Sequence, residues 1–259
     1  MSSISRGAII LRSDSVKAAE AQTRPTAWLL APASDSDWVT DAARILRDLG
    51  FAVQTGVSAT VPEMAADADL VMASAAAAIP SPLMQAWRAR GAVCAVVLPP
   101  GAAPALTRTE AAVATLRAPV TEAALLAMLA ARHYVALSAR EAAGIARAIA
   151  AQTFGNPAFA SELLQALVSS TRDDLAQLRQ AGASLETVRG VAHRLKASAH
   201  YVGCHALRLM AQRLEHAARD GDAATAAALA QIVAPTAARL LSLLASLPAA
   251  NTADKSAGK

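Results

Sequence analysis

The sequence predicts two folded units: an α/β domain built on a parallel sheet, followed by an all-α antiparallel helical bundle. From Thr26 to about Leu129, short apolar runs alternate with amphipathic stretches, which is typical of a parallel sheet with covering helices. From Ser138 onward no strand pattern remains, and short connections join long amphipathic stretches, which favours an antiparallel bundle. Alanine makes up roughly a quarter of the 259 residues and favours helix throughout.

These patterns divide the chain into four parts. We expect a polar N-terminal tail over 1–24, the α/β domain over 25–134, the helical bundle over 135–250 and a second tail over 251–259.

The predicted strands of the α/β domain are short and apolar. The run from Ala92 to Leu98 is continuous and rich in valine, as expected of a strand buried on both faces. Leu116 and Arg117 stand where a last strand would precede Pro119. The other predicted strands are Ala27–Leu30, Phe51–Val53 and Asp69–Met72, and the predicted helices are 37–49, 82–90 and 121–131.

Capping residues mark where the helices of the bundle begin. Ser138 and Glu141 form a capping box, and Asn156 precedes a proline that suits the first helical position. Ser184 and Asp222 are the next caps. The predicted helices run to about Ala151, from 157 to 180, from 185 to Gly203, from 205 to 219, and from 223 to about 247, the last with a kink at Pro235.

Composition argues against several classes of protein. The net charge of +4 comes from scattered arginines, so nucleic-acid binding is disfavoured. The two cysteines cannot form a disulfide framework. Each apolar run is interrupted before the ~18 residues of a membrane span, and the N-terminus does not resemble a signal peptide. We therefore expect a cytoplasmic protein.

One predicted helix carries the residues that indicate chemistry. At about 100° per residue, the apolar side chains around His193 fall in one stripe, which we expect to face the core, and His193 lies almost opposite it. Arg189, Lys196, Ala197 and His200 share the side of His193. The stripe consists of Val188, Val191, Leu195, Ala199 and Val202.

That arrangement suits phosphorylation of an imidazole. A neutral ring nitrogen is a competent nucleophile near pH 7. Lys196, the one lysine outside the predicted tails, lies within reach of phosphoryl oxygens on His193, and the small Ala197 leaves room for a partner. Taken alone, a surface histidine is usually only solvated, so the combination carries the argument.

The stretch from Ala192 to Ala199, followed by Gly203, Leu214-Glu215 and Arg219–Asp222, resembles the histidine phosphotransfer (HPt) domain over about residues 154–248. The resemblance implies that His193 accepts a phosphoryl group from an aspartyl phosphate on a receiver domain and passes it to another receiver. It implies that Lys196 stabilises the phosphoryl group. Ala197 stands where the family usually has glycine, a departure that affects docking rather than chemistry.

The first domain resembles a receiver domain whose active residues are missing. Leu116–Thr121 and the helix after it are similar to the end of that fold. Other residues stand where the family has its acidic pair, phospho-accepting aspartate, hydroxyl residue and lysine, namely Ala31-Pro32, Ser74, Pro99 and Ala118. Without carboxylates we expect no Mg²⁺ site and no phosphorylation there.

We therefore expect a phosphorelay intermediate, a carrier rather than an autonomous enzyme, whose partners are receiver domains of a hybrid kinase or response regulator. Arg189, Ala197 and His200 are the expected docking residues. We expect no cofactor and no metal on this chain, with Mg²⁺ on the partner only. The alternative is a regulatory module that binds a kinase or receiver without phosphotransfer.

Overall fold

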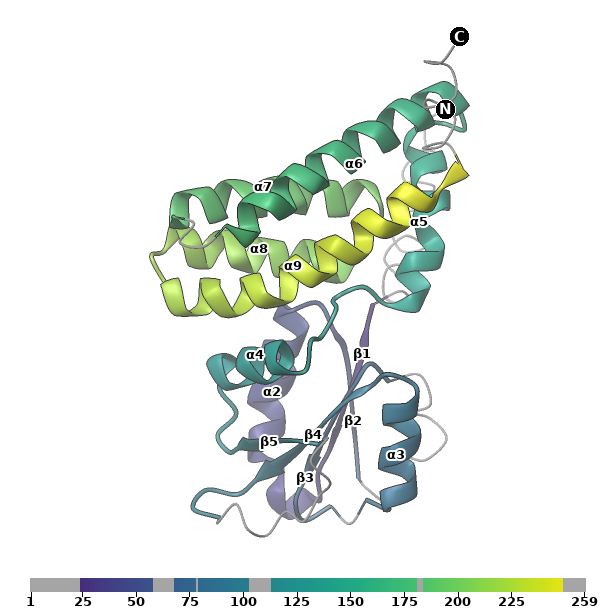
Figure 1. Ribbon diagram of the computed structural model, residues 1–259. Coiled ribbons are helices and arrows are strands. Elements are labelled where there is room, and N and C mark those ends of the chain that lie inside the picture. Colours follow the sequence, from purple (N-terminus) through teal and green to yellow (C-terminus); the bar gives the residue numbers. More distant parts are fainter. Residues whose placement is uncertain (1–23, 58–67, 78, 103–112, 181–183, 249–259) are drawn as a thin grey trace, which may run out of the picture.

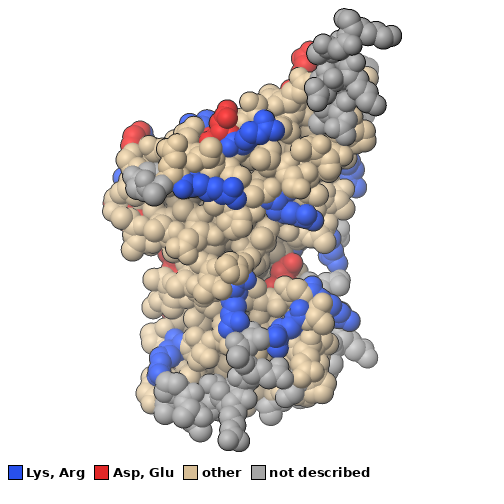
Figure 2. Space-filling view, viewed as in Figure 1, with Lys and Arg blue, Asp and Glu red and all other residues tan. Residues whose placement is uncertain are grey.

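The computed structural model describes residues 24–57, 68–77, 79–102, 113–180 and 184–248, in two halves that pack together (Figure 1 and Figure 2). The predicted tails lie outside these residues except for Arg24.

Five parallel strands form the sheet of the first half, in the order β2-β1-β3-β4-β5. Sequence analysis predicted the first four strands with ends that differ from the observed ends by one or more residues. For the fifth strand it predicted only the position, at Leu116 and Arg117. The bounds are β1 Thr26–Leu30, β2 Ala52–Gly56, β3 Leu70–Ser74, β4 Val93–Leu98 and β5 Ala114–Arg117. The predicted α/β class is therefore confirmed.

Helices cover both faces of the sheet because alternate side chains of a strand point to opposite faces. Ala27 and Leu29 pack into the core that includes α2 and α4, whereas Trp28 and Leu30 pack into a separate core with α3 (Figure 1). The bounds are α2 Asp37–Asp48, α3 Ser81–Ala89 and α4 Glu122–Ala131, with a short 3-10 helix, η1, at Ala33–Asp35.

The second half is helical, as predicted. Ser138, Asn156, Ser184 and Asp222 all cap helices through their side chains, so the expected starts are confirmed. The bounds are α5 Ala139–Gln152, α6 Pro157–Arg179, α7 Leu185–Tyr201, α8 His205–Arg219 and α9 Ala223–Ser246. In Figure 1, α6 to α9 lie side by side and α5 stands across one end of them.

The helix α9 runs through Pro235 as one helix. By length and composition it could cross a membrane, the one such helix in the described ranges. Its contacts give another reason for its apolar character, because it packs on α6 and α8 and contributes eight buried residues to the bundle.

One core connects the two halves. The buried cluster under α2 and α4 continues into the bundle without a break. Tyr134, in the connection between α4 and α5, stacks on Phe51 with ring centroids 5.3 Å apart. Arg213 of α8 binds Glu122 of α4 through two hydrogen bonds of 2.7 and 2.9 Å. The bundle is thus fixed against the α/β domain.

Candidate functional site

The helix α7 presents His193 to solvent. The Ser184 side chain accepts a hydrogen bond from Thr187 N and begins the helix. The predicted apolar stripe is buried, with Val191, Leu195 and Ala199 fully inaccessible, which confirms the orientation derived from the wheel. The His193 side chain is 66% exposed.

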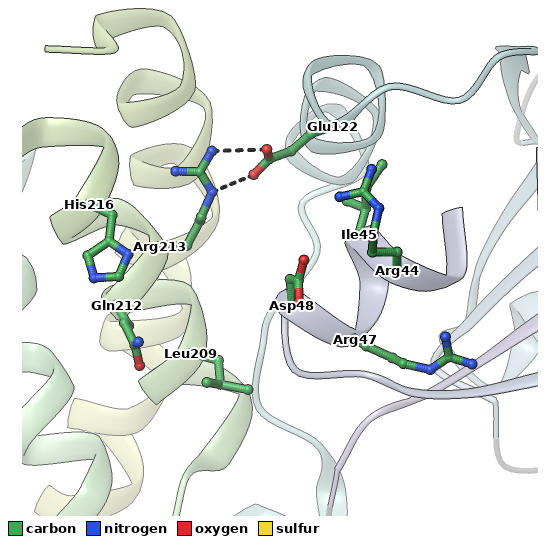
Figure 3. A pocket seen from close by; sticks show the side chains of 9 residues that line it. All are labelled: Arg44, Ile45, Arg47, Asp48, Glu122, Leu209, Gln212, Arg213 and His216. Carbon is green, nitrogen blue, oxygen red and sulfur yellow. Dashed lines mark hydrogen bonds and ion pairs between the residues drawn. The ribbon is translucent and has the colours of Figure 1, made fainter. Parts of the chain in front are cut away.

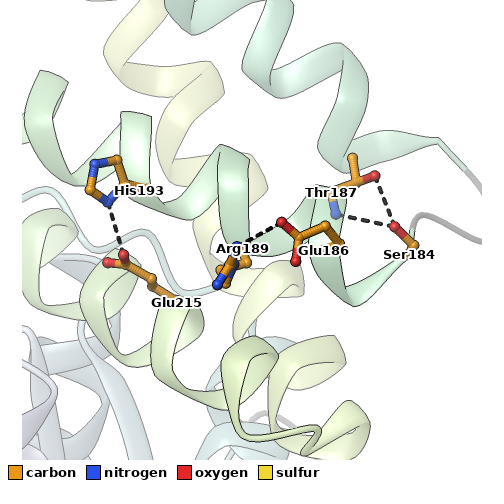
Figure 4. A network of polar contacts seen from close by, with 6 residues as sticks. All are labelled: Ser184, Glu186, Thr187, Arg189, His193 and Glu215. Atoms are coloured by element: carbon orange, nitrogen blue, oxygen red, sulfur yellow. Dashed lines mark hydrogen bonds and ion pairs between the residues drawn. The ribbon is translucent and has the colours of Figure 1, made fainter.

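A carboxylate from the neighbouring helix holds this histidine. Glu215 of α8 accepts a 2.8 Å hydrogen bond from His193 Nδ1 through its Oε1 atom (Figure 4). Its other oxygen, Oε2, accepts one of 2.5 Å from Lys196 Nζ. The three side chains, which we call the His–Glu–Lys cluster, bridge α7 and α8.

The charge of Glu215 is favoured by its two neighbours. Burial is the largest single influence and raises the pKa of Glu215, whose side chain is 19% exposed. The hydrogen bonds and charges of Lys196 and His193 together outweigh burial, and the net pKa lies below the ordinary value of 4.5. Glu215 is therefore ionised at neutral pH.

An ionised carboxylate can only accept hydrogen bonds, so the proton of a neutral His193 ring lies on Nδ1. The lone pair then lies on Nε2, which makes no hydrogen bond within the described part of the chain. The exposed edge of the ring is thus its nucleophilic edge.

Lys196 differs from expectation in one respect. Sequence analysis placed its ammonium in solvent, ready for phosphoryl oxygens, but its side chain is only 30% exposed and is paired with Glu215. The same ammonium therefore first orients the carboxylate that orients His193. It remains on the side of α7 that carries the ring.

The three expected docking residues lie on the exposed side of α7. Ala197 and His200 are exposed. Arg189 is 46% exposed and donates a 2.7 Å hydrogen bond to Glu186 one turn earlier (Figure 4). The surface around His193 therefore combines small, aromatic and paired charged side chains.

Sequence analysis assigned no role to two pairings of this site. Glu215 was noted only as part of the Leu214-Glu215 pattern. Arg194, next to His193, donates a 2.6 Å hydrogen bond to the buried Asp174 of α6. Burial is the main influence on Asp174 and raises its pKa, although Arg194 acts in the opposite direction. This pair fastens the far side of α7 to α6.

No metal centre is evident among the described residues, where no three His, Cys, Asp or Glu side chains converge. Cys204, the residue closest to a ligand spacing with His200, is buried, and burial raises the pKa of its thiol. A buried protonated thiol is a poor metal ligand.

The carboxyl edge of the sheet also differs from expectation. Ala31, Pro32 and Ser74 follow or end strands as expected, but η1 adds a carboxylate, because Ser74 Oγ donates a hydrogen bond to Asp35. Asp35 stands at neither the acidic-pair positions nor the aspartate position of the receiver pattern, so the expected absence of a Mg²⁺ site stays a prediction. Asp35 is a single acid, engaged by a serine where the receiver pattern would have its aspartate.

Comparison with known proteins supplies one finding. Residues 162–250, which span most of α6 and all of α7, α8 and α9, match the family model described as the Hpt domain. No curated protein and no solved structure matches the chain.

Proposed function

We propose that His193 is the residue that carries the phosphoryl group in a phosphorelay, since the match of residues 162–250 to the Hpt domain family supports a histidine phosphotransfer role. It receives the group from an aspartyl phosphate on one receiver domain and passes it to an aspartate on another. The chain is a carrier whose catalytic metal, Mg²⁺, belongs to its partners.

The proposed transfer is a substitution at phosphorus. The lone pair on His193 Nε2 attacks the phosphorus atom and forms the N–P bond. The bond from phosphorus to the carboxylate oxygen of the partner's aspartate breaks, and that carboxylate leaves with the electron pair. No proton has to move, because Nδ1 keeps its own.

The His–Glu–Lys cluster supports this step electrostatically. Positive charge develops on the ring as the N–P bond forms, and Glu215 already lies 2.8 Å from Nδ1 to stabilise it. Lys196 neutralises Glu215 before transfer and lies one turn from the ring, where its flexible stem can bring the ammonium to the phosphoryl oxygens. The reverse reaction uses the same contacts.

One observation carries the proposal. The Nε2 atom of His193 faces solvent, while its Nδ1 atom is hydrogen-bonded to the largely buried carboxylate of Glu215. A solvated surface histidine has no need of a partner from another helix. The expected docking residues Arg189, Ala197 and His200 remain part of the proposal, as contacts around the ring.

The α/β domain is proposed to be a receiver-like domain that is not itself phosphorylated. Its strand order is that of one common doubly wound fold, although many functions share such folds. Ser74 is 1% exposed and hydrogen-bonded to Asp35, which supports a structural role for that position. A cytoplasmic location is also proposed, since receiver partners and phosphodonors are found there.

The test replaces His193 by glutamine in the full chain. We expect wild type to take acid-labile, base-stable label from a phosphorylated receiver, and His193→Gln to take none. His133→Gln is the control, an exposed histidine between α4 and α5 that belongs neither to the site nor to its expected docking residues, and it should label normally. Equal labelling of His193→Gln and wild type would exclude His193 as acceptor, and binding without labelling of any protein would favour the non-transferring regulatory module.

A further inference from the structure

We propose that the α/β domain forms part of the surface on which the phosphorylated receiver docks, through a groove between α2 and α8 that continues the surface around His193. This inference rests on the proposed function of His193. It assigns a role to a domain that phosphotransfer chemistry does not itself require.

The groove lies where the two halves of the molecule meet. It encloses a cavity of about 370 Å³ and has one wall from α2 and one from α8, with Glu122 of α4 at its end (Figure 3). We call it the α2–α8 groove, and its other lining residues are Arg44, Ile45, Arg47, Asp48, Leu209, Gln212, Arg213 and His216.

The α8 wall of the groove adjoins the His–Glu–Lys cluster. Gln212 precedes Glu215 by three residues and His216 follows it directly, so both lie on the sides of α8 next to Glu215. Around the helix, the exposed surface passes from Glu215 through Gln212 and His216 to Arg213, which contacts the α/β domain.

The size of a docking surface decides whether a partner would reach the groove. A specific interface buries about 800 Å² on each partner, equivalent to a disc about 16 Å in radius. A helix with its side chains is only about 10 Å wide. A receiver centred on His193, on α7, therefore covers the width of α8 and reaches the groove on its far side.

The junction holds the two walls at a fixed separation. The bidentate Arg213–Glu122 pair spans it. Nearby, a Cβ atom on Gly50 would lie 3.0 Å from the Cα of Ala206, so the backbones after α2 and at the start of α8 are in close approach. A rigid surface loses little entropy on binding, which suits a transient partner.

The charges of the rim fit an acidic partner. Arg44 and Arg47 are exposed on α2 and outnumber Asp48, the acidic residue of that wall. Arg208 lies on the side of α8 that faces the cluster. Asp41 offsets Arg44 only weakly, since the two side chains are 67% and 53% exposed and their charged atoms 3.8 Å apart. The occupant we infer is the receiver that bears the aspartyl phosphate, because its phosphoryl group and metal-binding carboxylates make that face acidic.

The test compares two charge reversals on the full chain. Arg44→Glu changes the groove. Arg172→Glu is the matched control, an exposed arginine on α6, which is not among the helices that line the groove. The probe is a receiver domain that labels wild type, charged on its aspartate with radiolabelled acetyl phosphate, and the initial rate of label transfer is measured against receiver concentration at two salt concentrations.

We expect Arg44→Glu to raise the half-saturating receiver concentration about three- to tenfold at low salt, with a smaller effect at high salt and no change in the maximal rate. Arg172→Glu should match wild type. The split between half-saturation and maximal rate separates docking from damage to the chemistry, and circular dichroism checks that both variants are folded.

The outcomes separate this inference from the proposed function. If His193→Gln is unlabelled and Arg44→Glu saturates like wild type, the groove does not dock the receiver while the acceptor assignment stands. If His193→Gln labels like wild type, the acceptor assignment fails and the inference falls with it. If Arg44→Glu changes only the sedimentation of the protein alone, the groove is an interface between copies of this chain.

Discussion

At the scale of single residues, Glu215 determines what His193 can do. One carboxylate accepts from both His193 and Lys196, so the ring's tautomer, its orientation and the position of the ammonium all depend on it. The contacts that orient His193 also contribute to the stability of the fold, because they bridge α7 and α8.

The lowered pKa of Glu215 predicts a pH-dependent contribution to stability. A carboxyl group whose pKa falls on folding stabilises the folded state above its unfolded pKa, near 4.5, and this stabilisation is lost as the pH falls through the lower folded value. We expect wild type to exceed Glu215→Gln in free energy of unfolding at pH 7, and the difference to shrink below about pH 4.5. Urea denaturation from pH 7 to pH 3 measures it.

Glu186→Gln is the control for that series, because Glu186 and Arg189 form an exposed pair within α7. Its stability should follow wild type at every pH. A difference between wild type and Glu215→Gln that stayed constant down to pH 3 would contradict the assigned cause.

The sequence revealed part of the site because part of it is local. His193, Lys196 and Ala197 lie on one helix, where spacing alone fixes which side chains share a face. Glu215 is 22 residues from His193, and only the packing of α7 on α8 brings them together. No helical period in the sequence contains that contact, and for the same reason the pairing of Lys196 was missed.

At the scale of elements, helix starts were predictable where the cap is local. The box of Ser138 and Glu141 follows from their spacing. The start of α8 is different, because Cys204 provides no side-chain cap and Glu141 of α5 accepts a 3.1 Å hydrogen bond from Ala206 N instead. A cap supplied from 65 residues away has no local signature.

Thr236 of α9 provides a similar link. Its hydroxyl donates a 2.7 Å hydrogen bond to Ile232 O and accepts one of 2.9 Å from Ala136 N, in the connection between α4 and α5. Thr236→Val keeps the shape of the side chain but leaves the buried amide of Ala136 without its hydrogen-bond acceptor. We expect a loss of about 1–3 kcal/mol in the free energy of unfolding, measured by urea denaturation.

A buried threonine on α6 gives the matched control. Thr171 is fully inaccessible, like Thr236, but its hydroxyl has no hydrogen-bond partner among the residues that the structure describes. Thr171→Val should therefore leave stability unchanged or raise it slightly. Equal losses in the two variants would show that the Ala136–Thr236 bond contributes nothing specific.

At the scale of the whole molecule, the two halves share one hydrophobic core. Sequence analysis separated them correctly by class, since strand and helix periods differ, but it did not predict the shared core, because contacts between distant segments leave no periodic pattern. The junction includes the stacking of Phe51 on Tyr134, the approach of Gly50 to Ala206 and the packing of α4 on α9.

Substitution of Gly50 tests the importance of that junction. Gly50 has φ +97°, which disfavours a side chain, and a Cβ there would lie 3.0 Å from Ala206 Cα, on backbone that cannot easily yield. We expect Gly50→Ala to reduce the free energy of unfolding by about 2–4 kcal/mol, with a single transition for the whole chain. Thermal unfolding followed by circular dichroism measures both.

Gly91→Ala separates the cost of the positive φ from the cost of the contact with Ala206. Gly91 has φ +89° but nothing within 4 Å of a Cβ, so this variant carries the backbone cost without the contact. It should lose less stability than Gly50→Ala. Two separate transitions in Gly50→Ala, with the bundle unaffected, would mean that the halves fold independently.

The position of Lys196 also allows proteolysis to measure the local opening of α7. It is the one lysine in the described part of the chain and lies in the middle of α7, directly after the buried Leu195. An endoprotease specific for lysine can cut that part of the molecule only there, and only when the helix has opened to admit the peptide bond. The rate of that single cleavage would report how often the helix bearing His193 unravels, and a docked receiver should slow it.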